Sequence, residues 1–358
     1  MEHSPDSTRN LELLSELVLA PEPFRHSELP HFNEADLATL EALASSNHVI
    51  VRAFTPLERL LRREGRGREA ELFADALQKE QQRIDHALVF LEQICLTLDE
   101  SGCLPIVIKS LDHWPDLGSD LDLYSDGDPK QIVDVMKSAF QAKVEDRSWG
   151  DRLANKWNFS VPGLPELVEI HIRRLGQTGE QTAITGSLSD RAKQISLQSK
   201  VFRVAAPEDR IIISTLQRMY RHFYIRICDI VDNARLVDEG EVDFAYLRSL
   251  GSTAGLWEGI ATYLVIVSEY VKKYRGSDIP LPSLVTKCAK FGTDQVRFRR
   301  NFLRVSILPH SIALYAAELK SFLARGDLKN GLRLSLLPCL ATAAALEQKI
   351  TGSDKGIW

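Results

Sequence analysis

The sequence predicts an α+β protein in which a small mixed sheet is flanked by an N-terminal helical segment and a C-terminal helical domain. Helical periodicity fills the chain up to about residue 98 and returns at about residue 206, whereas the stretch between them holds short β-branched and alternating runs. The composition, with 44% hydrophobic and 26% charged residues, is ordinary for a globular protein of 358 residues. We expect units at residues 1–79, 80–205 and 206–358.

The N-terminal segment is predicted to be helical after a proline-rich lead-in that holds one short helix near Leu11–Leu19. Asn33 or Asp36 can cap the next helix. The pattern is clearest over Gln78–Leu98, where apolar side chains recur every three or four residues, at Ile84, Leu88, Leu91, Cys95 and Leu98. Ser101-Gly102 is expected to end this helix.

Four short runs in the middle of the chain predict strands, namely Leu104–Ile108, Asp120–Ser125, Lys156–Val161 and Leu167–Arg174. The first is apolar and β-branched, as in a buried strand, and the second alternates acidic with apolar residues, as in a strand with one polar face. The last two flank a turn rich in proline and glycine, which indicates a hairpin. Asp128 can cap a helix over Pro129–Ala142, whose first position is a proline.

The chain after Pro207 is predicted to be helical again. The expected segments are Glu208–Asp238, Phe244–Ser249, Leu256–Tyr274, Leu281–Lys290, a basic stretch near Gln295–Arg304, Ser311–Ala324 and Leu332–Ile350. The basic stretch interleaves Phe298 with arginines at 297, 299, 300 and 304. This pattern favours either a solvated helix face or a contact with RNA or a nucleotide.

Charge and cysteine usage exclude several classes of protein. The net charge of −5 argues against a surface built throughout for nucleic acid, although a local basic patch is compatible with it. The five cysteines are far apart and form no C-x-x-C pair, which indicates free thiols in a reducing cytoplasm. We expect no secretory signal, because Met1–Asn10 is polar, and no membrane partner, because the apolar run Leu334–Leu346 is interrupted by Pro338 and too short to span a bilayer.

The most informative segment is Leu111–Asp128, which contains six aspartates and no lysine or arginine. Asp120 and Asp122 lie two residues apart on a predicted strand, so both carboxylates point to one face. Two such charges repel unless a cation lies between them, and hard oxygen ligands favour Mg²⁺ or Mn²⁺. Asp126 and Asp128, by contrast, suit an ordinary solvated turn.

A second polar pair interrupts the last predicted strand of the sheet, where Glu169 and His171 share one face. One interpretation is an amphipathic edge strand whose glutamate pairs with Arg173 or Arg174. The other is a third carboxylate beside the aspartate pair. Three carboxylates can hold two metal ions about 3.5–4 Å apart, which is the arrangement used for in-line phosphoryl or nucleotidyl transfer.

Three segments together resemble one family. They are Ile108-Lys109-Ser110 at the end of the first strand, Ser119-Asp120-Leu121-Asp122-Leu123 on the second, and Val168-Glu169-Ile170-His171 on a later one. In this order they resemble the nucleotidyltransferase fold of the DNA polymerase β-like superfamily, in particular its uncharacterised bacterial nucleotidyltransferase family. The resemblance covers roughly residues 80–240.

The resemblance implies a small nucleotidyltransferase-fold core and an enzyme that moves an NMP group from an NTP to an acceptor with release of pyrophosphate. Mg²⁺ or Mn²⁺ would be bound by the catalytic carboxylates Asp120, Asp122 and Glu169. The phosphates would lie near Lys109, Ser110, Gly118 and Ser119, and His171 and His222 would contact the acceptor. The acceptor class stays open between a small molecule, a protein and RNA.

The predicted helix after Pro207 adds candidate cations. Arg218 and Arg221 lie within one turn of each other and can clamp phosphates if that helix faces the cleft, although a solvated basic helix face fits as well. Asp229 lies among apolar residues, so a buried partner is expected for it, and an arginine of the same domain can supply one.

Two other functions are compatible with these motifs. A nucleotide-binding or toxin–antitoxin-type module would keep the fold with little turnover. A glycosyltransferase would use D-x-D to bind Mn²⁺ and a nucleotide sugar, and it would need a long Rossmann-like region before the motif, which the helical first 100 residues do not offer.

Overall fold

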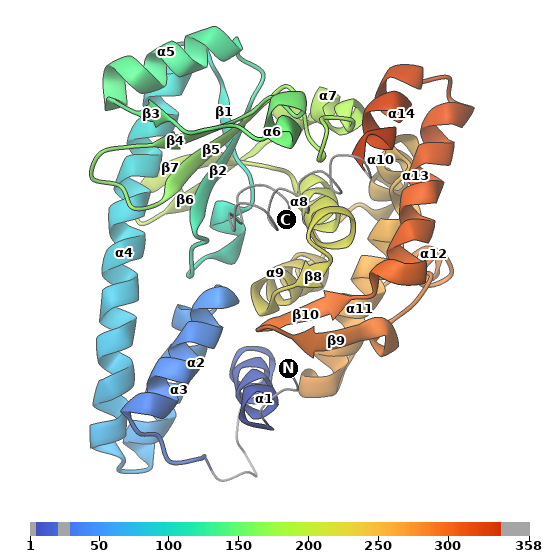
Figure 1. Cartoon of the computed structure of the whole chain (residues 1–358). Helices are drawn as coiled ribbons and strands as arrows, with labels where there is room; N and C mark the ends of the chain where they lie inside the picture. The colour runs from blue at the N-terminus through green and yellow to red at the C-terminus, as the bar shows by residue number, and fades with distance from the viewer. Residues whose placement is uncertain (1–4, 21–28, 338–358) are drawn as a thin grey trace, which may run out of the picture.

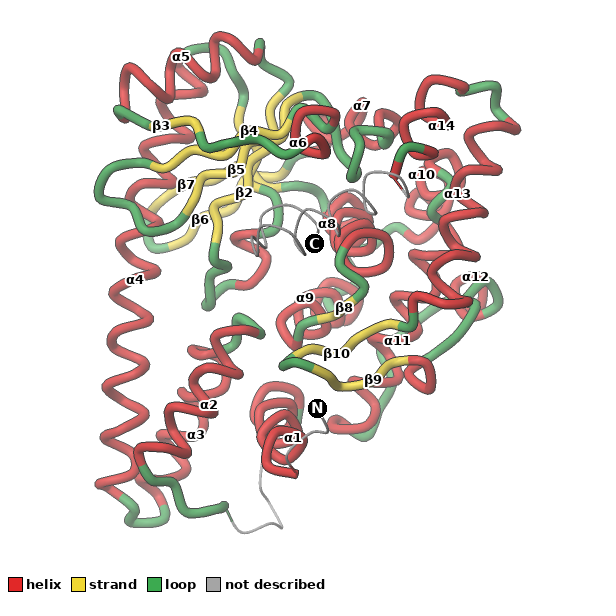
Figure 2. Tube along the Cα trace, in the orientation of Figure 1, coloured by secondary structure: helices red, strands yellow, loops and turns green. Residues whose placement is uncertain are grey.

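The computed structural model describes residues 5–20 and 29–337. It is a mixed α+β structure with a seven-stranded sheet, ordered β3-β4-β5-β2-β1-β7-β6, and a separate three-stranded sheet, ordered β8-β10-β9. Figure 1 shows the large sheet at one end of the molecule, with helices of the C-terminal half opposite it. The two sheets form separate groups of strands in Figure 2. The α+β class expected from the sequence is confirmed.

The N-terminal helices are α1 (Pro5–Leu19), α2 (Glu34–Ser46), α3 (Ile50–Arg63) and α4 (Gly67–Glu100). The side chain of Asn33 caps α2 by accepting hydrogen bonds from the backbone N–H groups of Ala35 and Asp36, at 2.8 and 3.0 Å. Helix α4 is longer than the predicted Gln78–Leu98 and continues without a break through residue 79. It packs on α3 at one end and on strands β1 and β7 at the other, so it connects the helical segment with the sheet (Figure 1).

The strands that carry the candidate site lie in the middle of the large sheet. They are β1 (Pro105–Val107), β2 (Asp120–Ser125), β4 (Lys156–Ser160) and β5 (Leu167–Ile172), and β3 (Lys143–Val144) lies beside β4 at the edge. Strands β4 and β5 pair antiparallel, as the hairpin pattern predicts. Strand β2 pairs antiparallel with β1 and parallel with β5, so β5 is an inner strand and not an edge. Asp128 caps helix α5 (Pro129–Phe140), as expected, and α6 (Trp149–Leu153) follows.

Three elements between residues 182 and 204 were not foreseen in the sequence: α7 (Thr182–Arg191), β6 (Lys193–Leu197) and β7 (Lys200–Val204). Strands β6 and β7 form an antiparallel hairpin around Gln198-Ser199, and both turn residues have positive φ, at 47° and 65°. Such a turn favours Asn-Gly or Asp-Gly. The Gln-Ser pair gives no such pattern, which explains why the hairpin is hard to detect.

The C-terminal half departs from the predicted run of helices in two places. The helix expected over Glu208–Asp238 is wrong as a single element, because α8 (Pro207–Thr215) and α9 (Ile227–Asp238) are separated by a π-helical turn at Leu216–Arg221 and by strand β8 (Tyr224–Ile225). The helix ends where Phe223 takes a left-handed conformation, with φ of 54°.

The helix expected near Gln295–Arg304 is also wrong, because the segment forms the hairpin of β9 (Val296–Arg299) and β10 (Phe302–Val305). Partly buried and exposed residues alternate along β9, and partly and fully buried residues alternate along β10, which is the period of a strand. The turn residues Arg300 and Asn301 both have positive φ.

The remaining helices are α10 (Phe244–Ala254), α11 (Trp257–Arg275), α12 (Ser283–Thr286), α13 (Ile312–Ala324) and α14 (Leu328–Ser335). Short α12 is the helical part of the predicted Leu281–Lys290, and the expected helix Leu332–Ile350 lies from residue 338 onward outside the described residues. Within residues 5–20 and 29–337, no helix is long and apolar enough to cross a bilayer.

Candidate nucleotide and metal site

One cavity of about 270 Å³ brings together all the residues predicted for the site except His171. Strands β1 and β2 and the loop between them supply Lys109, Ser110, Gly118, Ser119, Asp120 and Asp122, strand β5 supplies Glu169, and the segment after α8 supplies Arg218, Arg221 and His222. The cavity therefore has an acidic wall on the sheet and a cationic wall on the helical half. His171 lines a smaller neighbouring cavity that shares Lys109 and Arg221.

The acidic wall follows from the strand register. Asp122 lies directly opposite Glu169 in the parallel β2–β5 pair, and Asp120 lies two residues before Asp122 on the same face. Ser110 fixes this part of β2, because its hydroxyl donates to the carbonyl oxygen of Asp120 at 3.1 Å and accepts from the backbone N–H of Asp122 at 2.7 Å. The three carboxylates expected to act together thus share one face of the sheet.

Two lysines neutralise part of this wall. The ammonium of Lys109 contacts the Asp122 carboxylate and lies 3.5 Å from Glu169. Lys156, which was not predicted to belong to the site, lies 2.9 Å from both Glu169 and Asp151. Lys109 has a φ of 70°, an uncommon conformation for a residue other than glycine and one that recurs at functional sites.

The alternative in which Glu169 pairs with Arg173 or Arg174 is wrong. Arg173 donates to the carbonyl oxygen of Asp126 at 2.7 Å, and Arg174 donates to that of Gly179 at 2.9 Å. Both arginines follow the end of β5, where the chain leaves the sheet. Glu169 lies inside the sheet and is reached by lysines of β4 and of the loop after β1 instead.

Burial and charge act in opposite directions on these carboxyl groups. Burial raises the pKa of Asp122 to about 7, and Lys109 only partly offsets it. Burial alone would raise the pKa of Glu169, but the positive charges of Lys109 and Lys156 outweigh burial. The pKa of Glu169 therefore lies well below the ordinary value for a glutamate. The pKa of Asp120 is raised by burial and by the charge of Glu169. Burial therefore favours the protonated forms of Asp120 and Asp122, whereas the two lysines keep Glu169 ionised.

His171 is a neutral partner of Glu169. Burial lowers its pKa to about 4, although the nearby Glu169 opposes this shift. Its Nε2 lies 2.7 Å from Glu169 Oε1, and because a carboxylate only accepts hydrogen bonds, Nε2 carries the proton. Nδ1 is buried and has no hydrogen-bond partner among the described residues.

The cationic wall contains three arginines, of which one forms an ion pair with a described residue. Arg218 is only 2% exposed, and its Nε lies 2.6 Å from the Asp229 carboxylate. This confirms the arginine partner expected for Asp229. Neither Arg221 nor Arg226 forms an ion pair within the described part of the chain, and both line the cavity. No described carboxylate competes for either guanidinium, so both can bind an anion, although that of Arg226 also contacts the Tyr224 hydroxyl at 3.5 Å.

Five cavity-lining residues were missed in the sequence, namely His48, His113, Gln217, Tyr224 and Arg226. Tyr224 and Arg226 could have been found, because they alternate with a buried isoleucine directly after the arginines that were predicted. The two histidines come from distant segments and stack on each other, with ring centroids 5.6 Å apart. Nothing in their local sequence indicates that contact.

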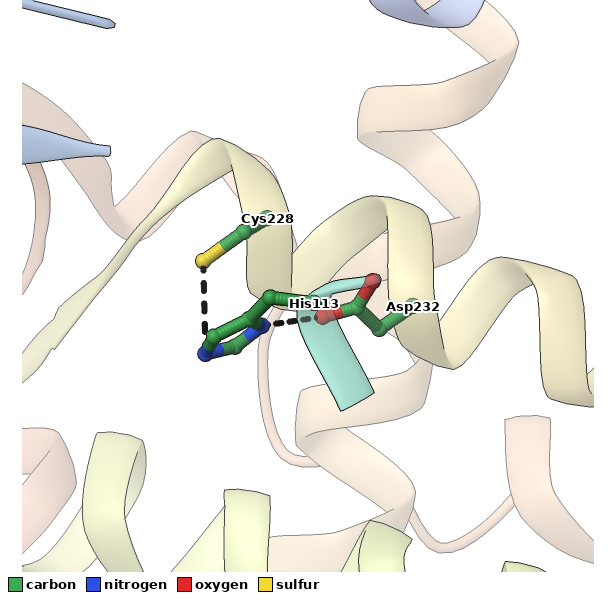
Figure 3. A group of neighbouring side chains, drawn as sticks. All are labelled: His113, Cys228 and Asp232. Atoms are coloured by element: carbon green, nitrogen blue, oxygen red, sulfur yellow. Dashed lines mark hydrogen bonds and ion pairs between the residues drawn. The ribbon is translucent and has the colours of Figure 1, made fainter. Parts of the chain in front are cut away.

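A buried cluster joins the loop before β2 to helix α9 (Figure 3). His113 Nδ1 lies 2.5 Å from Asp232, and Nε2 lies 3.9 Å from the sulfur of Cys228, whose thiol pKa is raised by burial. Asp232 is also 2.6 Å from Arg52. These bonds hold the loop that carries Lys109 and Ser110 against the helical half. The described cysteines are free thiols, namely Cys95, Cys103, Cys228 and Cys288.

The acidic wall fits a divalent cation. Ligand atoms of Asp122 and Glu169 lie within 4.8 Å of each other and of a ring nitrogen of His171. The two carboxylates are the candidate metal ligands here, and His171, whose Nε2 donates to Glu169, orients one of them. The Lys109 ammonium already lies against both carboxylates, so this part of the wall accepts a positive charge. Asp120 forms no ion pair with a described residue and leaves a further oxygen donor. An oxygen-rich set of this kind suits Mg²⁺ or Mn²⁺.

No family model matches the chain, and no curated protein matches it. The functional assignment therefore depends on the cavity and on the chemistry of its two walls.

Proposed function

We propose that the chain is a metal-dependent nucleotidyltransferase with the fold of the DNA polymerase β-like superfamily, similar to that superfamily's uncharacterised bacterial family. One observation carries the proposal: three carboxylates on neighbouring parallel strands share a cavity with two arginines that pair with no described carboxylate. A metal–triphosphate complex needs both kinds of wall. Its cation requires oxygen ligands, and its phosphates require guanidinium or ammonium donors.

In the proposed reaction, an oxygen of the acceptor attacks the α-phosphorus of the NTP. A new P–O bond forms, the bond between the α-phosphorus and the bridging oxygen breaks, and that oxygen keeps the electron pair as pyrophosphate leaves. The proton of the acceptor hydroxyl passes to a carboxylate of the acidic wall. Bound Mg²⁺ or Mn²⁺, held by Asp120, Asp122 and Glu169, would supply neutralisation of phosphate charge.

The chain's own cations have separate tasks in this scheme. Arg221 and Arg226 have no carboxylate partner among the described residues, so we assign them to the phosphates. Arg218 is neutralised by Asp229 and contributes mainly to the shape of the wall. Lys109 contacts the acidic wall and lines the cavity, so it can exchange its carboxylate contacts for a phosphate oxygen. Ser110 and Gly118-Ser119 are small residues that let phosphates approach the backbone.

The test compares Asp120→Asn/Asp122→Asn with the control Asp126→Asn/Asp128→Asn, which makes the same two substitutions in the neighbouring turn. Each protein is titrated with Mn²⁺ by electron paramagnetic resonance and is then incubated with each labelled NTP, Mg²⁺ and cell extract. We expect the site variant to lose Mn²⁺ binding and to transfer label at least about 100-fold more slowly. The control is expected to match the wild type. Equal transfer by the site variant would refute the proposed site.

A second candidate function is a nucleotide-binding module with little turnover. The contact of Lys109 with Asp122 and Glu169 favours it, because an ammonium that stays there competes with a metal ion. NTP binding without pyrophosphate release, and without Mn²⁺ binding, would support this module. The glycosyltransferase alternative gains no support, because the described residues before Asp120 form four α-helices, one three-residue strand and a single 3₁₀ turn.

A further inference from the structure

The small sheet β8-β10-β9 has two chemically different faces. Arg304 of β10 lies opposite Arg297 of β9 and opposite Tyr224 of β8, so these three side chains share one face. Because side chains alternate along a strand, Arg299 and Phe302 lie on that face as well. We call this face, with Arg226 and the turn residue Arg300, the basic platform. The opposite face carries Ile225, Leu303 and Val305, which are buried.

The aromatic pair of the basic platform is surrounded by guanidinium groups. The rings of Tyr224 and Phe302 stack with centroids 4.3 Å apart and planes at 22°. Arg304 lies 5.5 Å from the Tyr224 ring, and Arg226 lies within 6 Å of both rings, at 5.6 and 5.8 Å. Neither ring is fully buried.

The residues that the structure describes do not neutralise the positive charge of the basic platform. Arg297, Arg299 and Arg300 are exposed and form no ion pair in the part of the chain that the structure describes. The pKa of Arg304 is lowered, by burial and by the charges of Arg300 and Arg299. Like charges gathered on one face without carboxylates favour an anionic partner.

The cavity itself does not account for these arginines. Its triphosphate-binding cations are Lys109, Arg221 and Arg226, whereas Arg297, Arg299 and Arg300 do not line it. Tyr224 and Arg226 belong to both the cavity and the platform, so the two surfaces are continuous. With strands about 4.8 Å apart and about 3.4 Å per residue, the platform measures roughly 10 by 13 Å, which matches a few nucleotides of an extended strand.

We propose that the basic platform binds single-stranded nucleic acid, with phosphates on its arginines and bases against the aromatic pair. Arginine and aromatic side chains on one sheet face are the combination that such strands require, since every base offers a ring face for stacking. An acidic protein segment would bind the arginines through its carboxylates but would not require the aromatic pair. A consequence that rests on the proposed function is that the strand's terminal hydroxyl is the acceptor.

The test measures fluorescence anisotropy of a labelled single-stranded RNA of about 16 nucleotides, with DNA of the same sequence, the DNA duplex and polyglutamate as comparison ligands. Arg297→Gln/Arg299→Gln/Arg300→Gln is compared with Arg63→Gln/Arg68→Gln/Lys79→Gln, which removes three exposed charges from α3 and α4. We expect the platform variant to bind at least about tenfold more weakly. We also expect its log–log salt slope to fall by about 2, since each lost phosphate contact on a single strand contributes about 0.7.

Two further variants separate folding from binding. Replacing the same three arginines by lysine keeps the charge and is expected to restore most of the salt slope, and Phe302→Leu is expected to weaken binding about fivefold or more through lost stacking. The inference is overturned if the platform variant and its control bind RNA equally, or if duplex DNA or polyglutamate binds as tightly as a single strand. Tighter binding of RNA than of DNA, or the reverse, identifies which strand the platform takes.

The two proposals can fail separately. Asp120→Asn/Asp122→Asn is expected to bind RNA like the wild type, because the platform does not include the carboxylates. If the protein binds RNA through these arginines but transfers no NMP group to any acceptor, the RNA-binding proposal is supported and the proposed enzyme activity is contradicted. If label is transferred to a component of the extract but never to a bound strand, the claim that the strand's terminal hydroxyl is the acceptor is overturned.

Discussion

Asp209 provides the sharpest stability test, because it is a buried carboxyl group with few partners. It lies in the first turn of α8, is fully buried, and neither of its oxygens accepts a hydrogen bond from a described residue. Its nearest cation is Arg191, at 3.5 Å, and that guanidinium also pairs with Glu208. Burial raises the pKa of Asp209 to about 6, against the partial compensation by Arg191.

The magnitude follows from this shift. The carboxyl pKa is about 3.9 in an unfolded chain, so it differs by about two pKa units from the folded value, and each unit corresponds to about 1.36 kcal/mol. Between about pH 4 and pH 6 the folded state holds the proton more tightly than the unfolded state. The stability that this protonation gives is therefore complete below about pH 4 and is lost as the pH rises through about 6. The loss amounts to about 3 kcal/mol.

Asp209→Asn removes the ionisation with little change in shape. We expect the variant to exceed the wild type in free energy of unfolding by up to about 3 kcal/mol at about pH 7.5, and by nearly nothing at about pH 4. Urea unfolding followed by circular dichroism at several pH values measures this difference. The exposed Asp190→Asn is the control and is expected to stay within about 0.5 kcal/mol of the wild type. A less stable Asp209→Asn at about pH 7.5, or a difference that does not change with pH, would refute the reasoning.

Two other predictions concern packing around the helical wall. Asp229→Ala leaves the buried guanidinium of Arg218 without its partner and is expected to lower the free energy of unfolding in urea by about 3–5 kcal/mol. The double variant Arg218→Met/Asp229→Leu removes both charges and should lower it by less than that single change. A double variant less stable than the single one would contradict this. Gly259→Ala places a Cβ 2.3 Å from the Tyr220 hydroxyl and is expected to lower stability by about 1–3 kcal/mol. The matched Gly186→Ala in α7 meets no atom within 4 Å and should gain up to about 1 kcal/mol in thermal unfolding; equal effects of the two alanines would rule out the steric explanation.

The acidic wall of the site could be predicted from the sequence because the periodicity of a strand depends only on neighbouring residues. Asp120 and Asp122 alternate with apolar residues, as do Glu169 and His171, so the face that each pair shares could be read from spacing alone. The helix caps at Asn33 and Asp128 follow from equally local chemistry.

The basic platform shows where local reasoning fails. A segment with arginines at 297, 299, 300 and 304 and no glycine or proline suits a solvated helix by composition, yet it forms a hairpin around Arg300-Asn301. The choice between a helix and a hairpin depends on the burial of one face of the segment against the helical half. Local propensity carries no information about that burial. Tyr224 joins this sheet only because Phe223 ends the preceding helix.

By itself the sequence determined the α+β class, the acidic and basic segments and the faces that neighbouring residues share, because these depend on backbone periodicity over a few residues. Only the tertiary structure decided which charges meet. It placed Asp122 opposite Glu169, bound Lys109 and Lys156 to them, neutralised Arg218 with Asp229 and left Arg221 and Arg226 to face the cavity. The reason is physical: electrostatic energy depends on the distance and burial of groups that are far apart in the chain, and these are fixed only when the elements pack.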